Sequence, residues 1–115
     1  MIVAAADPAL VQLLTAVLRD AELRVYQAHD AQAAYELALE LGVDVVVTNS
    51  CVGTVDGDIL VNALRSRRPQ LPVLHISAGR LQDRKVEEHI PPGVPSLKEP
   101  FTEQELLQAV ATLLP

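Results

Sequence analysis

Side chains that could do chemistry occur where short apolar runs of the sequence end. Asp7 follows the apolar run at residues 2–5, and Asn49, Ser77 and Glu99 follow three later runs. Carboxylates, amides and hydroxyls are the groups that bind divalent cations and phosphoryl oxygens. These positions are therefore the first candidates for a functional site.

Other reactive residue types do not combine into a catalytic or metal-binding set. His75 and Ser77 are two residues apart, but no acid is evident to orient the imidazole, so we predict a core histidine and not a catalytic dyad. His29-Asp30 has no second His-Asp element beside it, and Cys51 is a single thiol that we interpret as an inert small residue. We predict no catalytic residues and no metal site.

The basic residues Arg65, Arg67 and Arg68 form a compact cluster of positive charge. Two interpretations stay open for it. It is a docking patch for an acidic partner, or it is the solvated C-terminal end of a helix, where cations suit the helix dipole. We favour the second.

Composition excludes several classes of protein. The chain has 115 residues, with 15 Asp plus Glu against 9 Lys plus Arg and a net charge of −6. This length fits one domain, and the charge together with two Tyr, one Phe and no Trp disfavours nucleic-acid binding. No apolar run approaches the ~18 residues of a membrane span, and no basic signal region follows Met1. We expect a cytoplasmic domain that contacts neither membrane nor nucleic acid.

Short β-branched runs alternate with helix-length amphipathic stretches along the whole chain. This alternation predicts an α/β domain with a five-stranded parallel sheet and five helices, doubly wound with right-handed connections. The strands are predicted at residues 2–5, 23–27, 43–48, 72–76 and 94–98, and residues 49–57 are expected to form a loop. Helices are expected to begin at Asp7, Asp30, Arg80 and Thr102, and a further one follows the loop that ends at Gly57. The helix at residues 80–90 has little apolar surface to bury, and Thr102 with Glu105 forms a capping box.

In such a sheet, ligands bind at the edge where the carboxyl ends of the strands meet. The order of residues at these ends resembles the response-regulator receiver (CheY-like) domain, with flavodoxin-like topology, over residues 1–115 as a single domain. The resemblance rests on Asp7-Pro8 after the first strand, on Val55-Asp56-Gly57, on the run from Pro72 to Ala78, and on Pro100-Phe101 before the last helix.

The resemblance implies a phosphorylation site that this sequence lacks. Ala5 and Ala6 stand at the positions of the family's acidic pair, Asn49 at the phosphoacceptor Asp, and Glu99 at the Lys. An amide cannot form an acyl phosphate, and two alanines offer no oxygen to Mg²⁺. We therefore expect no cofactor, with Mg²⁺ binding lost.

Two further positions belong to the family's conformational switch. Ser77 retains the hydroxyl, whereas Ser96 replaces the aromatic residue often found three positions before the Lys. Asn49 itself has two interpretations that we weigh equally: a polar anchor that holds the pocket in one state, or a residue that only satisfies backbone groups.

These residues predict a degenerate receiver, or pseudo-receiver, of a two-component phosphorelay pathway. It would act by protein–protein interaction without phosphorylation, and not as an enzyme. The expected partners are a histidine kinase, an output domain or another regulator, and the face of the fourth helix, fifth strand and fifth helix could form a homodimer. The alternative is a small-molecule or cofactor sensor that uses the crevice at the strand ends.

Overall fold

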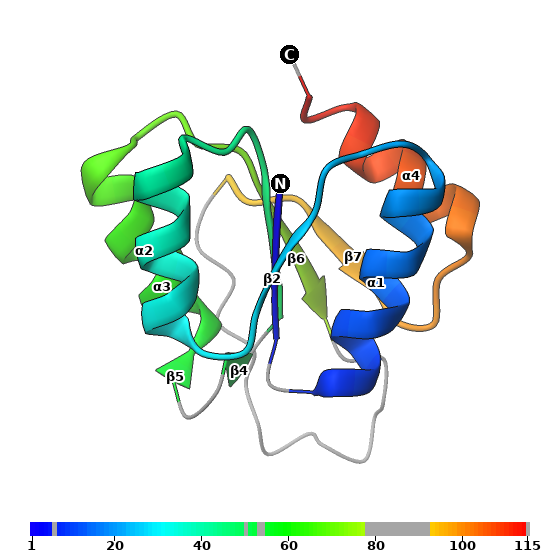
Figure 1. Ribbon diagram of the computed structural model, residues 1–115, viewed down its shortest axis with the longest axis horizontal. Helices are drawn as coiled ribbons and strands as arrows, with labels where there is room; N and C mark the ends of the chain where they lie inside the picture. The colour runs from blue at the N-terminus through cyan, green and yellow to red at the C-terminus, as the bar shows by residue number, and fades with distance from the viewer. Residues whose placement is uncertain (6, 50, 53–54, 78–92, 115) are drawn as a thin grey trace.

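A computed structural model describes residues 1–5, 7–49, 51–52, 55–77 and 93–114 (Figure 1). The elements, in chain order, are β1 (Ile2–Ala4), α1 (Pro8–Asp20), β2 (Tyr26–Ala28), α2 (Ala31–Leu41), β3 (Val46–Asn49), β4 (Cys51–Val52), β5 (Val55–Asp56), α3 (Gly57–Arg67), β6 (Val73–Ser77), β7 (Ser96–Lys98) and α4 (Glu103–Ala111).

Five of the strands form one parallel sheet in the order β2-β1-β3-β6-β7. Helices α2 and α3 cover one side of this sheet, and α1 and α4 cover the other (Figure 1). The predicted doubly wound, flavodoxin-like fold is confirmed. Four helices lie in the described ranges; the fifth predicted helix, at residues 80–90, lies outside them.

Several local predictions were wrong. The third strand was predicted from residue 43 and begins at Val46, and the fifth was predicted from residue 94 and begins at Ser96. Residues 49–57 are not a plain loop, because Cys51 pairs with Asp56 and Val52 with Val55 in a small antiparallel ribbon, β4–β5. The second strand begins three residues later than expected. The amide of Leu23 still donates to the carbonyl of Leu18 at 3.1 Å, so the turn that ends α1 occupies the residues assigned to the start of the strand.

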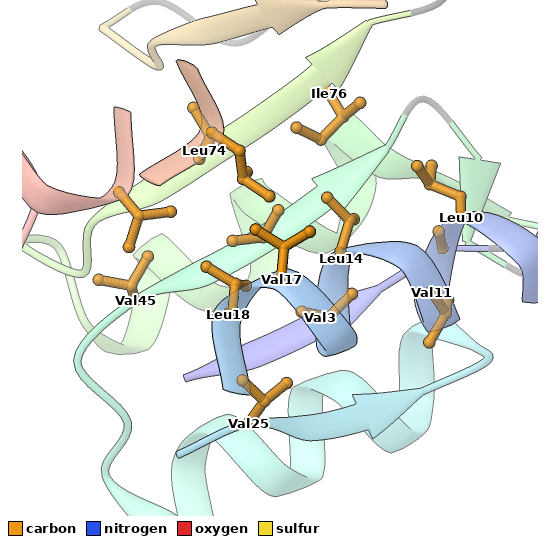
Figure 2. Packing of buried hydrophobic residues seen from close by; sticks show 14 residues of the cluster. Val3, Leu10, Val11, Leu14, Val17, Leu18, Val25, Val45, Leu74 and Ile76 are labelled. Carbon is orange, nitrogen blue, oxygen red and sulfur yellow. The ribbon is translucent and has the colours of Figure 1, made fainter. Parts of the chain in front are cut away.

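Side chains alternate between the two faces of the sheet and build two apolar layers. Ile2, Val46 and Val73 are level with one another and belong to the layer beneath α2 and α3. The next residues, Val3, Val47 and Leu74, belong to the layer beneath α1 and α4. Figure 2 shows this second layer, in which leucines of α1 pack on the valines of the central strands. The three central strands, β1, β3 and β6, are buried on both faces, as the run of valines predicted for the third strand.

The helix starts follow the predicted capping. Asp7 accepts a hydrogen bond from the amide of Ala9 at 3.0 Å, and Asp30 accepts one from Ala33 at 2.7 Å. Thr102 and Glu105 form the reciprocal capping box of α4. These caps fix where each helix leaves the sheet, and so they position the strand ends.

No helix in the described ranges is long and apolar enough to cross a membrane.

Candidate functional site

The register of the sheet brings the predicted site positions to one edge. Asn49 is the last residue of β3 and lies level with Ile76 of β6, and Ala5 directly follows β1. Ser77 ends β6, and Glu99 directly follows β7. Because β1, β3, β6 and β7 are consecutive neighbours in the sheet, these four residues line its carboxyl edge.

The position of the acidic pair is apolar where the structure describes it. Ala5 is 1% exposed and packs in the layer beneath α1 and α4. Ala6 lies outside the described residues. Asp7, the nearest carboxylate in the sequence, points to the backbone as the N-cap of α1. It does not replace the missing pair.

Asn49 is half-buried at the end of β3, where the family has its phosphoacceptor. The hydroxyl of the preceding Thr48 donates to the carbonyl oxygen of Asn49 at 3.4 Å. An amide nitrogen on Cγ leaves no carboxylate oxygen to attack phosphorus, so this residue cannot carry an aspartyl phosphate.

Glu99 is tied by its main chain to the end of β6. Its amide donates to the carbonyl oxygen of Ser77 at 3.0 Å, one step beyond the last paired residues, Ser77 and Lys98. Glu99 is half-buried and Lys98 is exposed. Leu97 and Asn49 are both level with Ile76, and side chains alternate along a strand. Glu99, two residues after Leu97, therefore belongs to the same face of the sheet as Asn49. Lys98 belongs to the opposite face and does not supply the missing cation.

Beside this edge, a polar row crosses the sheet face beneath α2 and α3. Thr48, His75 and Ser96 lie level on three neighbouring strands. Thr48 and His75 are each 1% exposed, whereas Ser96 is exposed. The buried His75 fits the predicted core histidine. Thr48 was missed from the sequence, where it looks like the last member of an apolar run; a hydroxyl directly before the strand-end Asn49 was the available signal.

Mg²⁺, which the receiver resemblance implies, does not fit these residues. The cation needs several oxygen ligands in octahedral geometry. Ala5 supplies a buried methyl group at one ligand position, and Asn49 supplies at most a neutral carbonyl oxygen at another. Among the described residues, no group of three or more His, Cys, Asp or Glu could hold a metal ion.

The three arginines of the cluster, Arg65, Arg67 and Arg68, have different environments in the fold. Arg68 points inward, and its guanidinium donates to the carbonyl oxygen of Val43 at 2.8 Å and to that of Ala38 at 3.5 Å. Arg65 is half-buried, and Arg67 is exposed. The three residues are therefore not one docking patch, and Arg68 instead links the C-terminal ends of α2 and α3.

Comparisons with known proteins agree with the fold. A family model described as the response regulator receiver domain matches residues 1–111. The DNA-binding dual master transcriptional regulator RpaA of Synechocystis is 32% identical over 111 residues, which cover 94% of this chain and 46% of that protein. The chain thus spans about half the length of this curated relative.

Solved structures are similar over nearly the whole chain. A response regulator receiver protein from Sinorhizobium medicae is 26% identical with a TM-score of 0.77, covering 97% of this chain and 90% of that one. The receiver domain of Francisella response regulator 1452 is also 26% identical, with a TM-score of 0.81 and coverage of 97% and 93%.

Proposed function

The chain belongs to the response regulator receiver domain family, and we propose that it is a signalling domain of a two-component pathway that acts without being phosphorylated. The observation that carries this proposal is the carboxyl edge of the sheet, where Ala5, Asn49 and Glu99 occupy the positions of the acidic pair, the phosphoacceptor and the Lys.

Phosphoryl transfer to a receiver needs three contributions. A carboxylate attacks phosphorus, a divalent cation offsets the charge of the phosphoryl oxygens, and positioned cationic donors stabilise the transition state. Asn49 lacks the nucleophilic oxygen, Ala5 lacks a ligand for the cation, and Glu99 brings negative charge where a cation is needed. The nucleophile, the cation ligand and the cationic donor are all replaced, which supports a site that is inactive in phosphotransfer. Restoring one of these groups by mutation would still leave the site without the other two.

The mechanism that remains is recognition by a fixed surface. A histidine kinase, an output domain or another regulator would bind the folded domain in its single state, and the domain itself would not act as an enzyme. The relative from Synechocystis is named as DNA-binding, but it is about twice as long as this chain. With a net charge of −6, this domain is a poor ligand for a phosphate backbone. We propose a protein partner and a cytoplasmic location.

A cofactor sensor of flavodoxin-like type has less support. Such a site needs an open crevice at the strand ends and aromatic side chains to stack on a ring. Ala5 is buried in the apolar layer at that place, and the whole chain has only two Tyr and one Phe.

Intact mass after incubation with acetyl phosphate and Mg²⁺ tests the proposal. The wild-type chain should gain no phosphoryl group, and neither should Asn49→Asp alone, because Ala5 and Glu99 remain. A receiver that carries the acidic pair, the Asp and the Lys is the positive control. A stoichiometric gain of one phosphoryl group on an Asp of the wild-type chain would overturn the proposal.

Binding to a kinase or output domain provides the second test. The affinity of the wild-type chain for that partner should be the same before and after the phosphodonor treatment. An affinity that changes with the treatment would show that the domain still switches.

A further inference from the structure

Large apolar side chains are exposed mainly on the layer that contains α2 and α3. Four such residues are exposed in the described ranges: Leu41 at the end of α2, Ile59 in the first turn of α3, Tyr26 on β2, and Leu13 on α1. Tyr26 is level with Ile2, whose side chain lies beneath α2 and α3, so alternation directs Tyr26 to the same layer. Three of the four therefore belong to one side of the molecule.

Helix α2 is apolar around most of its circumference. It packs on the sheet through the buried Ala34 and Ala38, and the larger Tyr35, Leu37 and Leu39 stay only half-buried on its flanks. Its polar residues are confined to one stripe at four-residue spacing, Gln32, Glu36 and Glu40. A helix with so narrow a polar stripe is typical of one that is covered on more than its sheet-facing side.

The charges of α2 and α3 have opposite signs. Residues 31–41 contain Glu36 and Glu40 and no basic residue, whereas α3 contains Asp58 near its start and two arginines, Arg65 and Arg67, in its last turn. Glu40 and the exposed Arg67 each lie in the last turn of their helix. The two helices lie side by side and run in the same direction, because each connects one parallel strand to the next (Figure 1).

We propose that this surface, which we call the α2–α3 face, binds a second copy of the chain. The face is defined by Tyr26, Glu36, Glu40, Leu41, Ile59 and Arg67. In the dimer, a two-fold axis runs parallel to α2 and α3, between the two copies. It places α2 of one copy opposite α3 of the other, with the C-terminal ends of the two helices at the same height. Glu40 of each copy then contacts Arg67 of the other, so the pair occurs twice in the dimer. The contact also covers the exposed Tyr26, Leu41 and Ile59.

The charges of α4 disfavour pairing through that helix. Residues 103–111 contain Glu103 and Glu105 and no basic residue, and both acids are exposed. A two-fold contact between two such helices brings like charges together, which opposes association. The proposal is independent of phosphorylation, and a monomeric protein would leave the proposed function intact.

Sedimentation equilibrium of the full chain tests the dimer. We expect a dissociation constant of about 10–100 µM, typical of a small polar interface. Glu40→Lys and Arg67→Glu should each weaken it about tenfold, since symmetry repeats every lost pair. The double variant Glu40→Lys with Arg67→Glu should recover the wild-type affinity, which an unfolded protein could not do.

Two matched variants locate the surface. Ile59→Asp should abolish the dimer, whereas Leu13→Asp, at a similarly exposed leucine on α1, should leave it unchanged. Glu103→Lys should have no effect. A wild-type chain that stays monomeric at about 1 mM, or a dimer that responds to Glu103→Lys or Leu13→Asp but not to the α2–α3 variants, would overturn the proposal.

Discussion

The amide of Glu99 donates a hydrogen bond of 3.0 Å to the carbonyl oxygen of Ser77, and so fixes an acidic residue at the end of β6. In the receiver family these two positions carry the Lys and the switch hydroxyl that serve the phosphoryl group. Here Ser77 retains the hydroxyl and is 8% exposed, whereas Glu99 is negatively charged where the family has a positively charged Lys. The scaffold of the site is thus intact although its charge pattern is not, which is why we expect a folded, binding-competent receiver without phosphotransfer.

Adjacent leucines of α1 should differ strongly in their contribution to stability. Leu14 is 1% exposed in the core layer of Figure 2, and Leu13 is 52% exposed. Leu14→Ala should lower the free energy of unfolding by about 2–5 kcal/mol, because it leaves a cavity. Leu13→Ala should change it by less than about 1 kcal/mol. Urea denaturation of both variants measures the difference, and equal effects would contradict the assignment of the core face.

Arg68 should stabilise the fold rather than serve a partner. Arg68→Ala removes donors from the carbonyl oxygens of Val43 and Ala38 and should cost about 1–3 kcal/mol of unfolding free energy. Arg24→Ala, at an exposed arginine, is the control and should cost less than about 0.5 kcal/mol. Equal losses in the two variants would rule out the link between α2 and α3.

The capping box of α4 should be measurable on its own. Thr102→Ala removes the acceptor for the amide of Glu105 and should lower stability by about 1 kcal/mol. Thr112→Ala removes only a hydroxyl at the other end of the same helix and should have a smaller effect. Thermal unfolding of both variants compares them, and a larger loss in Thr112→Ala would contradict the predicted capping.

The α-amino group of Met1 should release its proton more readily in the folded chain than in the unfolded chain. Burial lowers its pKa from the ordinary 8.0, and the Asp44 carboxylate raises it by a smaller amount. A cation with a depressed pKa is disfavoured by folding. Its contribution to stability is therefore complete above pH 8.0 and declines as the pH falls through the folded pKa. The pH dependence of amine acylation, native against urea-unfolded, measures both values, and a higher native pKa would refute this.

The sheet and most helix starts were predictable because their signals are local. A valine run specifies a doubly buried strand, and Asp7, Asp30 and Thr102 specify caps by side-chain geometry. The proposed loss of phosphotransfer also comes from the sequence, since replacement of a carboxylate by Asn or Ala is a change of chemistry at a position that the receiver resemblance assigns.

What the sequence could not reveal depends on contacts between distant segments. The inward turn of Arg68 depends on carbonyl groups of α2 and of the chain before β3, which are 30 and 25 residues away. The delayed start of β2 is different, because it depends on a local turn in which the amide of Leu23 donates to the carbonyl oxygen of Leu18, five residues earlier. There a hydrogen bond that ends a helix outweighed the strand preference of the same residues.

The most direct test of the proposed loss of phosphotransfer is the amide NMR spectrum of the residues at the carboxyl edge of the sheet. Two-dimensional NMR of the labelled wild-type chain would follow the amides of Asn49, Ser77 and Glu99 during addition of Mg²⁺ and then acetyl phosphate. We predict unchanged shifts at all three, because Ala5 and Asn49 offer Mg²⁺ no carboxylate ligand and the Asn49 amide cannot accept a phosphoryl group. Saturable shifts at these amides with Mg²⁺, or a second set of peaks after the phosphodonor, would contradict the account.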